Sequence, residues 1–344
     1  MTEYHPFREL LKARMREFLR EPETIFWVYA FPVLLVIGLG IAFSNRPAER
    51  VFVDIQQNDR AEEVAVNLSK NPVFVAAIRS EQECMERLRL GKSTLVVVPG
   101  AKTEYVFDPT RPESVLARRQ VDDALQRAAG RRDPLFTEDR YVTEPGTRYI
   151  DFLIPGLIGM NLLAGSMWGV GYVIVDMRVR KLLKRFVATP MKRSHFLWSA
   201  LGGRMVFMVP ELAVILGAGV ILFDFPIRGD IFSILFVSFL GAVSFSGLGL
   251  LAACRAKKLE TASGIMNVIM MPMWLLSGVF FSSERFPDSL QIIINALPLT
   301  QFNYALRAVI LEDASLSSQL WRLIFIASWG AVSYICTLRW FRWN

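Results

Sequence analysis

Residues that build enzyme active sites are scarce in this sequence. Its 344 residues include two histidines and three cysteines. It contains neither an HExxH nor a GxSxG pattern, which excludes the zinc-protease and serine-hydrolase classes that depend on them. Gly91-Lys92-Ser93 resembles the end of a phosphate-binding loop, but the first glycine of such a loop would fall on Glu86. We therefore expect a chain that is not an enzyme and that binds no ATP, metal or other cofactor itself.

Cysteine is too scattered for a disulfide framework, and acidic residues are outnumbered. Cys254 and Cys336 fall at or in apolar segments, whereas Cys84 stands alone in a polar region. The chain has 32 acidic residues against 39 Lys and Arg, which gives a net charge of +7. The cations lie beside apolar segments, on alternate sides. Membrane topology explains that pattern, so we expect no nucleic acid partner.

Long apolar blocks dominate what is present. Hydrophobic residues make up 53% of the chain and gather in blocks of about twenty, the length of a helix that crosses a bilayer. The pattern predicts an all-α, multi-pass protein of the cell (inner) membrane with six transmembrane helices. Both termini would be cytoplasmic, and a small α/β extracytoplasmic domain would lie between helices 1 and 2. The predicted spans are 25–43, 150–175, 196–223, 231–254, 263–281 and 320–341.

The first 24 residues predict an amphipathic helix in the cytoplasmic headgroup layer, in contact with membrane lipid. Apolar residues recur on one face from Phe7 to Leu19, and five cations occupy the other faces. The apolar block that follows has no small-residue cleavage site, so we interpret it as an uncleaved signal anchor. Pro32 should kink this first span gently.

Residues 44–148 have the composition of a soluble domain. Short β-rich runs at 51–55, 73–78, 94–98 and 105–107 alternate with polar helical stretches at 60–68, 81–90 and 112–129. This alternation predicts a small α/β domain. Because one crossing precedes it, the domain would lie outside the cytoplasm.

The loop at 176–195 belongs to the most basic stretch of the chain. From Asp176 to Arg204 there are eight Lys or Arg residues against a single acid, which would hold a short loop in the cytoplasm. Its apolar residues recur at helical spacing until a Thr-Pro pair ends the pattern. These residues are Val179, Leu182, Leu183 and Phe186, followed by Thr189-Pro190. We predict a short amphipathic helix on which a soluble protein docks; the alternative is a topology signal without a partner.

Ionisable residues within spans are candidates for function, because a charge at membrane depth is costly. Glu211 follows Pro210 in the third span, and Arg204 lies two turns earlier on the same face. This spacing predicts an ion pair that reaches a neighbouring helix, while Asn161 gives the second span a polar group. Glu211 either has a structural role, at the backbone opened by Pro210 or between helices, or lines a substrate path. The three residues are too scattered to indicate a membrane-embedded enzyme.

Two other patterns within spans concern packing. Gly165 and Gly169 form a small-xxx-small pair that suits close helix contact. Four methionines in the fifth span give an adaptable apolar surface that could line the path of a variable lipophile, although methionine is also ordinary core filler. They are Met266, Met270, Met271 and Met273.

Four segments together resemble the membrane subunit, or permease, of the ABC-two export superfamily. They are the amphipathic helix before the first span, KLLKRFVATPMKRSHFL (181–197), LSGVFFSSERFP (276–287) and LPLTQFNYALRAVIL (297–311). The last two are the more specific. The resemblance covers the first fifty residues and nearly everything after Tyr149, but not the domain between them.

The resemblance implies a half-transporter. Two such subunits pair as a homodimer, and each docks a separate nucleotide-binding ATPase, which holds the ATP and Mg. The loop after span two would be the coupling helix, with ATPase contacts at Arg180, Lys181, Leu182, Leu183, Phe186, Thr189 and Pro190. Spans two and five would face the partner subunit and frame the path. Re-entrant helices at 286–311 would form an outer gate with Phe280, Phe281, Pro287 and Pro298.

The predicted function is therefore ATP-driven efflux of a lipophilic or amphiphilic substrate, a drug or a lipid, from the cytoplasm or the inner leaflet. One alternative is export of polysaccharide or another cargo. A second is a non-transporting sensor or scaffold whose extracytoplasmic domain binds a ligand. An importer is disfavoured, because the cytoplasmic motif of the common importers is not found.

Overall fold

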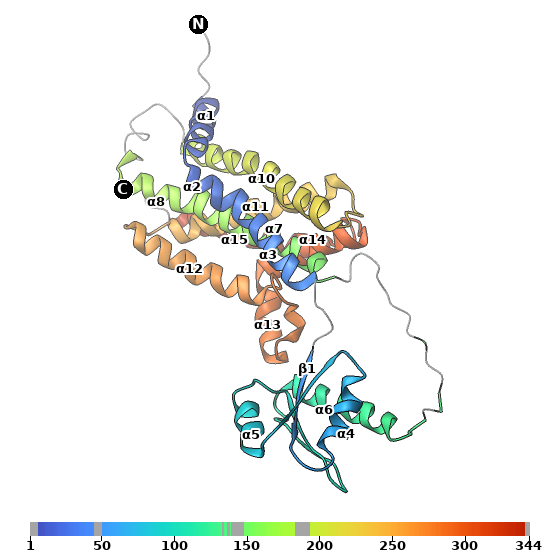
Figure 1. Cartoon of the computed structure of the whole chain (residues 1–344). Coiled ribbons are helices and arrows are strands. Elements are labelled where there is room, and N and C mark those ends of the chain that lie inside the picture. The colour runs from blue at the N-terminus through green and yellow to red at the C-terminus, as the bar shows by residue number, and fades with distance from the viewer. Residues whose placement is uncertain are drawn as a thin grey trace. The chain divides into compact units, whose positions relative to one another are not determined.

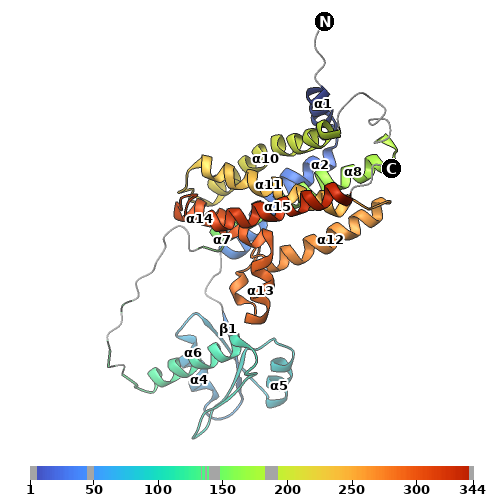
Figure 2. The same ribbon diagram turned by 180° about the vertical axis from the view of Figure 1, so that it is seen from behind.

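The computed structural model describes residues 6–44, 50–132, 134, 135, 138, 148–182 and 193–340. The chain divides into a helical unit, Met1–Ser44 with Thr143–Asn344, and an inserted unit, Asn45–Val142. Each unit has its own hydrophobic core. Figure 1 colours both along the chain, and Figure 2 shows them from behind.

Six helical segments among the described residues are long and apolar enough to cross a bilayer. The first span joins α2 (Pro22–Ile25), a π-helical turn η1 (Phe26–Ala30) and α3 (Phe31–Ser44). The second joins α7 (Tyr149–Ser166), the π-helical segment η2 (Met167–Tyr172) and α8 (Val173–Val179). The others are α10 (Arg193–Phe223), α11 (Ile231–Ala253), α12 (Leu259–Leu276) and α15 (Leu320–Trp340).

All six predicted spans fall on these segments, but several ends shift. α12 stops at Leu276, five residues before the predicted end, and Gly278 just beyond it is left-handed with φ of +70°. Glycine adopts that conformation without a steric penalty, which allows the chain to turn there. The second span continues to Val179. The first part of the predicted loop 176–195 is therefore helical.

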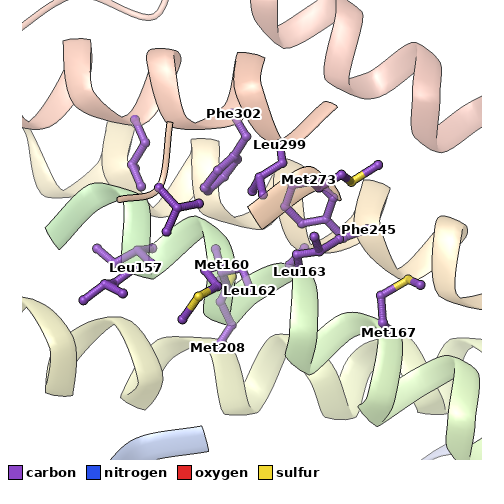
Figure 3. Packing of buried hydrophobic residues seen from close by; sticks show 14 of the residues in the cluster. Leu157, Met160, Leu162, Leu163, Met167, Met208, Phe245, Met273, Leu299 and Phe302 are labelled. Carbon is purple, nitrogen blue, oxygen red and sulfur yellow. The ribbon is translucent and has the colours of Figure 1, made fainter. Parts of the chain in front are cut away.

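Spans 2 and 4 form the middle of the helical unit. In each of them 67% of the most apolar stretch is buried, against 17–28% in the other four. Side chains such as Leu157, Leu163 and Phe245 pack together there, with Phe302 from a shorter helix (Figure 3). These two helices therefore form the core of the helical unit.

The closest approach of the central helices occurs at glycines other than the predicted pair. A Cβ atom on Gly171 would lie 2.4 Å from the Gly249 carbonyl oxygen. Gly165 instead faces the guanidinium of Arg204, and Gly169 has open space around it. The small-xxx-small pattern thus identified the right helix but not the residues in contact, because spacing alone does not say which way a glycine faces.

The helix α1 (Pro6–Leu19) packs on the third span. The ring of Phe18 stacks on that of Phe207 with centroids 3.9 Å apart, and Gly203 lies beside Leu11 and Arg14. Leu19 is 65% exposed. The apolar face expected to lie on lipid is therefore partly used for packing within the chain.

One end of the bundle is rich in Lys and Arg, and we call it the basic end. There the end of α8 meets the end of α11 through Arg178, and Arg255 lies over the ring of Trp340 at the end of α15. The described cations of this end include Arg14, Arg178, Arg180, Lys181, Arg255, Lys257, Lys258 and Arg339.

The opposite end carries three short elements after α12. They are the 3-10 turn η3 (Ser283–Arg285), α13 (Asp288–Ala296) and α14 (Pro298–Glu312). Pro298 begins α14 rather than interrupting a helix, which is the position where its missing N–H costs least. α14 is mostly buried, whereas α13 exposes Ile292 and Ile293.

The inserted unit is the predicted α/β fold. Its strands are β1 (Val51–Gln56), β2 (Phe74–Arg79), β3 (Leu95–Val98) and β4 (Glu104–Val106), and its helices are α4 (Ala61–Ser69), α5 (Glu81–Arg89) and α6 (Pro112–Ala128). The sheet order is β2-β1-β3-β4, with β4 antiparallel to β3 and the other pairs parallel. Side chains alternate between the faces of a strand, so Val53 and Ile55 pack into the core formed with α4 and α6.

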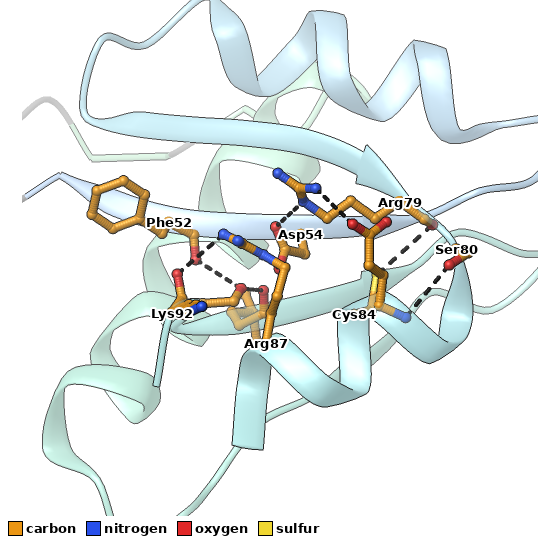
Figure 4. Close-up of polar contacts among 10 residues, drawn as sticks. Phe52, Asp54, Arg79, Ser80, Cys84, Arg87 and Lys92 are labelled. Atoms are coloured by element: carbon orange, nitrogen blue, oxygen red, sulfur yellow. Dashed lines mark hydrogen bonds and ion pairs between the residues drawn. The ribbon is translucent and has the colours of Figure 1, made fainter. Parts of the chain in front are cut away.

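The other face of this sheet holds a buried carboxylate. Asp54 is 2% exposed and accepts from Arg87 Nε at 2.9 Å, while Arg79 Nε lies 3.4 Å away (Figure 4). Ser80 caps α5 by accepting from the Glu83 N–H. The two arginines thus fasten α5 to the centre of the sheet, which is a structural arrangement.

Candidate functional site

The predicted ion pair of the third span is present and buried. Arg204 Nη1 lies 2.6 Å from Glu211 Oε2, and neither residue is more than 6% exposed. Arg204 also reaches span 2, where Nε donates to Ser166 Oγ and Nη2 donates to the Leu162 carbonyl, each at 3.3 Å. The pair therefore joins α10 to the central helix α7.

The surroundings of this pair fit it closely. A Cβ atom on Gly165 would lie 2.7 Å from Arg204 Cζ, so glycine leaves the space that the guanidinium occupies. On the side of span 1, the Tyr29 hydroxyl donates to the Phe207 carbonyl at 3.4 Å. A buried ion pair of this kind is costly to break, because removing one partner leaves an uncompensated charge.

Asn161 contacts span 1. Its Nδ2 donates to the Val28 carbonyl at 2.9 Å. Val28 lies four residues before Pro32, which has no N–H to return to that carbonyl. The π-helical turn η1 immediately precedes Pro32. The side chain of Asn161 therefore satisfies a backbone group that the proline leaves open.

The methionine candidates lie in the core. Met266, Met270 and Met273 are at most 6% exposed and belong to the main hydrophobic cluster, whereas Met271 is 64% exposed. The outward face of α12 is instead formed by Ile265, Val268, Met271 and Leu275. Within one copy of the chain, the three buried methionines pack as filler.

The outer-gate candidates lie around the turn after α12. The Phe280 carbonyl accepts from the Tyr149 hydroxyl at 2.9 Å, and the side chain of Phe281 is exposed. Pro287 precedes α13, and Pro298 begins α14. The turn is thus bonded to the start of α7.

Two residues of α14 that the sequence analysis did not single out hold this turn. Asn303 Nδ2 donates to the Ser277 carbonyl at 2.9 Å. Arg307 donates to the carbonyls of Phe152 and Gly278, and its guanidinium lies 3.6 Å from the ring centroid of Phe152. Their spacing of four residues, which places both on one face of α14, was the signal that could have identified them.

The coupling candidates fall only partly within the described chain. Arg180 Nε pairs with Asp176 Oδ1 at 2.9 Å, and its side chain is otherwise exposed. Lys181 is exposed and has a left-handed backbone with φ of 59°, and Leu182 follows it. Leu183, Phe186, Thr189 and Pro190 lie outside the described residues. The first residues of the predicted coupling segment thus lie at the basic end.

Arg178, which the sequence analysis counted among the loop cations, is bonded within the bundle. Its Nη1 donates to the carbonyls of Ala253 and Ala256 at 2.9 and 2.8 Å, and its Nη2 donates to the Cys254 carbonyl at 3.3 Å. These carbonyls lie at and just past the end of α11. Arg178 therefore caps span 4 from span 2.

Six helical segments long and apolar enough to cross a bilayer, two of them at the centre of the bundle, define a multi-pass membrane protein. A family model described as "ABC-2 family transporter protein" matches residues 22–339. The chain belongs to this family.

Two permeases of Escherichia coli are similar to this chain over most of its length. The "Probable multidrug ABC transporter permease YbhR" of Escherichia coli K12 is 23% identical, covering 96% of this chain and 98% of its own length. The "Probable multidrug ABC transporter permease YbhS" of the same organism is 21% identical, covering 88% of each chain. The "Inner membrane transport permease YadH" is 26% identical over 45% of this chain and 60% of its own length. The matches to the first two also include the inserted unit, for which the sequence analysis found no motif.

Proposed function

We propose that this chain is the membrane subunit of an ATP-driven exporter in the inner membrane. A separate ATPase subunit binds ATP and Mg and docks at the basic end. The observation that carries the proposal is the place where the basic loop begins, directly after Val179 at the end of one of the two most buried spans. A protein that contacts this loop from outside is thereby connected to the centre of the bundle.

The basic end faces the cytoplasm in this proposal. At least eight described Lys and Arg residues lie there, and cations beside spans are retained on the cytoplasmic side. The inserted α/β unit then lies outside the cytoplasm. A cysteine placed at exposed Lys102 should react with an impermeant thiol reagent added to intact cells, whereas one at exposed Lys257 should not. The reverse labelling would overturn this orientation.

Two copies of the chain pair in the proposal, through spans 2 and 5. The outward face of α12 is apolar and uncovered in one copy, and Gly169 of span 2 has open space beside it. Cysteines at Val268 or Met271 should therefore form disulfide-linked dimers in membranes. A cysteine at Ile221, which is 81% exposed on span 3, serves as the matched control.

The cargo in this proposal is lipophilic or amphiphilic. The exposed faces of the spans are apolar, and YbhR and YbhS are named multidrug permeases. Candidate drugs and lipids should stimulate ATP hydrolysis by the reconstituted complex. Stimulation by a polysaccharide precursor alone would redirect the proposal to that cargo.

The test of ATPase docking uses charge in the coupling segment. Leu183→Asp and Phe186→Asp should abolish co-purification of the ATPase while the chain still inserts in the membrane, because an apolar contact cannot accommodate a carboxylate. Leu116→Asp, at an exposed leucine of α6, is the control and should leave co-purification unchanged. Retained ATPase binding and transport in both segment variants would exclude this surface.

A further inference from the structure

The end of α11 is capped by a side chain from another span. The last carbonyls of a helix have no partner within it and carry partial negative charge, which cations stabilise. Arg178 bonds three carbonyls of this end, those of Ala253, Cys254 and Ala256, at 2.8 to 3.3 Å. A topology signal would need only the positive charge, not this geometry.

Span 2 is divided where its π-helical segment η2 interrupts the α-helix. Before η2, Arg204 of the third span donates hydrogen bonds to Ser166 and to the Leu162 carbonyl. After η2 comes α8, the lower part of span 2, which leads into the basic loop. Arg178 bonds α8 to the end of span 4. π-Helical turns often occur at functional positions in membrane and soluble helices. The lower part of span 2 thus has an anchor of its own.

We infer that Arg178 is a positioning residue of the transport cycle, which joins the lower part of span 2 to the end of span 4. A displacement of the segment after Leu182 then moves both central helices together. This inference rests on the proposed function, because it takes the docked ATPase as the source of the displacement. It assigns to Arg178 the transmission of movement, and not contact with the ATPase or with cargo.

Arginine is suited to this role in a way that lysine is not. Its planar guanidinium presents donors in a fixed fork, and Nη1 and Nη2 here reach different carbonyls. Lysine would keep the charge that determines topology but would present its donors from a single point. Arg178→Lys therefore separates the geometry from the charge, and Arg178→Met removes both while keeping similar bulk.

The first measurement tests whether the hydrogen bonds of Arg178 hold the end of α11 closed. Cys254 is 5% exposed at the capped end, so its rate of reaction with a membrane-permeant maleimide reports opening of that end. In a Cys84→Ser/Cys336→Ser background, Arg178→Lys and Arg178→Met should raise this rate about tenfold or more, as expected when charge-assisted hydrogen bonds are lost. Lys257→Gln, which removes an exposed cation of the loop between α11 and α12, should not raise it. An unchanged rate in the Arg178 variants would contradict the inference that Arg178 joins span 2 to the end of span 4.

The second measurement tests transmission in the complex of the full chain with its ATPase. The Arg178 variants should bind the ATPase as the unsubstituted chain does and hydrolyse ATP, but transport per ATP hydrolysed should fall about tenfold, with Arg178→Lys no better than about a third of normal. Normal transport by both variants overturns the inference and leaves the proposed function standing. Failure of the unsubstituted chain to recruit an ATPase overturns the proposed function and the transmission role, while the labelling result still decides whether Arg178 joins span 2 to the end of span 4.

Discussion

The amide of Asn161 donates to the Val28 carbonyl, and this carbonyl is the one that Pro32 cannot bond. Asn161→Leu would leave it without a donor in an apolar environment. We expect a loss of about 1–3 kcal/mol of stability, measured as a lower midpoint of thermal unfolding in detergent. In a Pro32→Ala background, where residue 32 regains an N–H, the same substitution should cost less. An equal cost in both backgrounds would show that the two residues are not coupled.

The ion pair of Arg204 with Glu211 predicts strong coupling between two substitutions. Arg204→Met or Glu211→Leu alone leaves a buried charge without its partner and should cost about 3–5 kcal/mol, whereas the double variant should recover most of that loss. Thermal unfolding of the four proteins gives the coupling energy. If the double variant is stable and also transports normally, the pair is structural. If it is stable but inactive, the residues act in the transport path.

Two glycines of η2 predict different outcomes for the same substitution. Gly171→Ala would place a methyl group 2.4 Å from the Gly249 carbonyl oxygen, so the central helices would have to separate. We expect a loss of about 1–3 kcal/mol. Gly169→Ala meets nothing within 4 Å and should leave the unfolding midpoint unchanged. Equal effects would mean that helix propensity, and not the close contact, determines the outcome.

The raised pKa of Tyr105 predicts that the stability of the inserted unit falls at alkaline pH. Burial, together with the charge and hydrogen bond of Asp122, raises the pKa of its phenol to about 12 from 10.0. The folded state then holds the proton to a higher pH than the unfolded chain. This contribution to stability is complete below about pH 10 and is lost between about pH 10 and 12. The difference in phenolate absorbance between the unsubstituted chain and Tyr105→Phe should show a midpoint near 12, and a midpoint near 10 would contradict it.

The spans could be predicted because bilayer thickness fixes the length of an apolar block, whatever packs beside it. The strands and helices of the inserted unit followed from their alternating patterns for a similar reason. Their order in the sheet did not follow, because β1 pairs with both β2 and β3 through contacts distant in sequence. The left-handed turn at Gly278 was also missed, since LSGVFF reads as a continuation of the span.

The roles of individual cations could not be predicted. Arg178 and Arg180 are two residues apart in the same basic stretch, yet the first bonds the end of α11 and the second is mostly exposed. The residue type specifies the charge of each arginine, whereas its bonding partner depends on which helix packs beside it in the fold. Asn161 was recognised as polar, but its partner was not. That partner is the Val28 carbonyl in span 1, which is open because Pro32 has no N–H to bond it. Arg307 was missed because the segment that forms α14 was expected to be a short re-entrant helix, whereas α14 is mostly buried in the bundle.

The position of Arg204 and Glu211 on a single helix has a consequence for biogenesis. An arginine that depended on a carboxylate from another span would enter the bilayer with its charge uncompensated until that span arrived. Here Arg204 and Glu211 lie seven positions apart in α10 and form an ion pair with each other. The third span therefore carries its own counter-ion into the membrane, which lowers the cost of inserting it. The remaining donors of Arg204 then bond to the second span, which has already been synthesised.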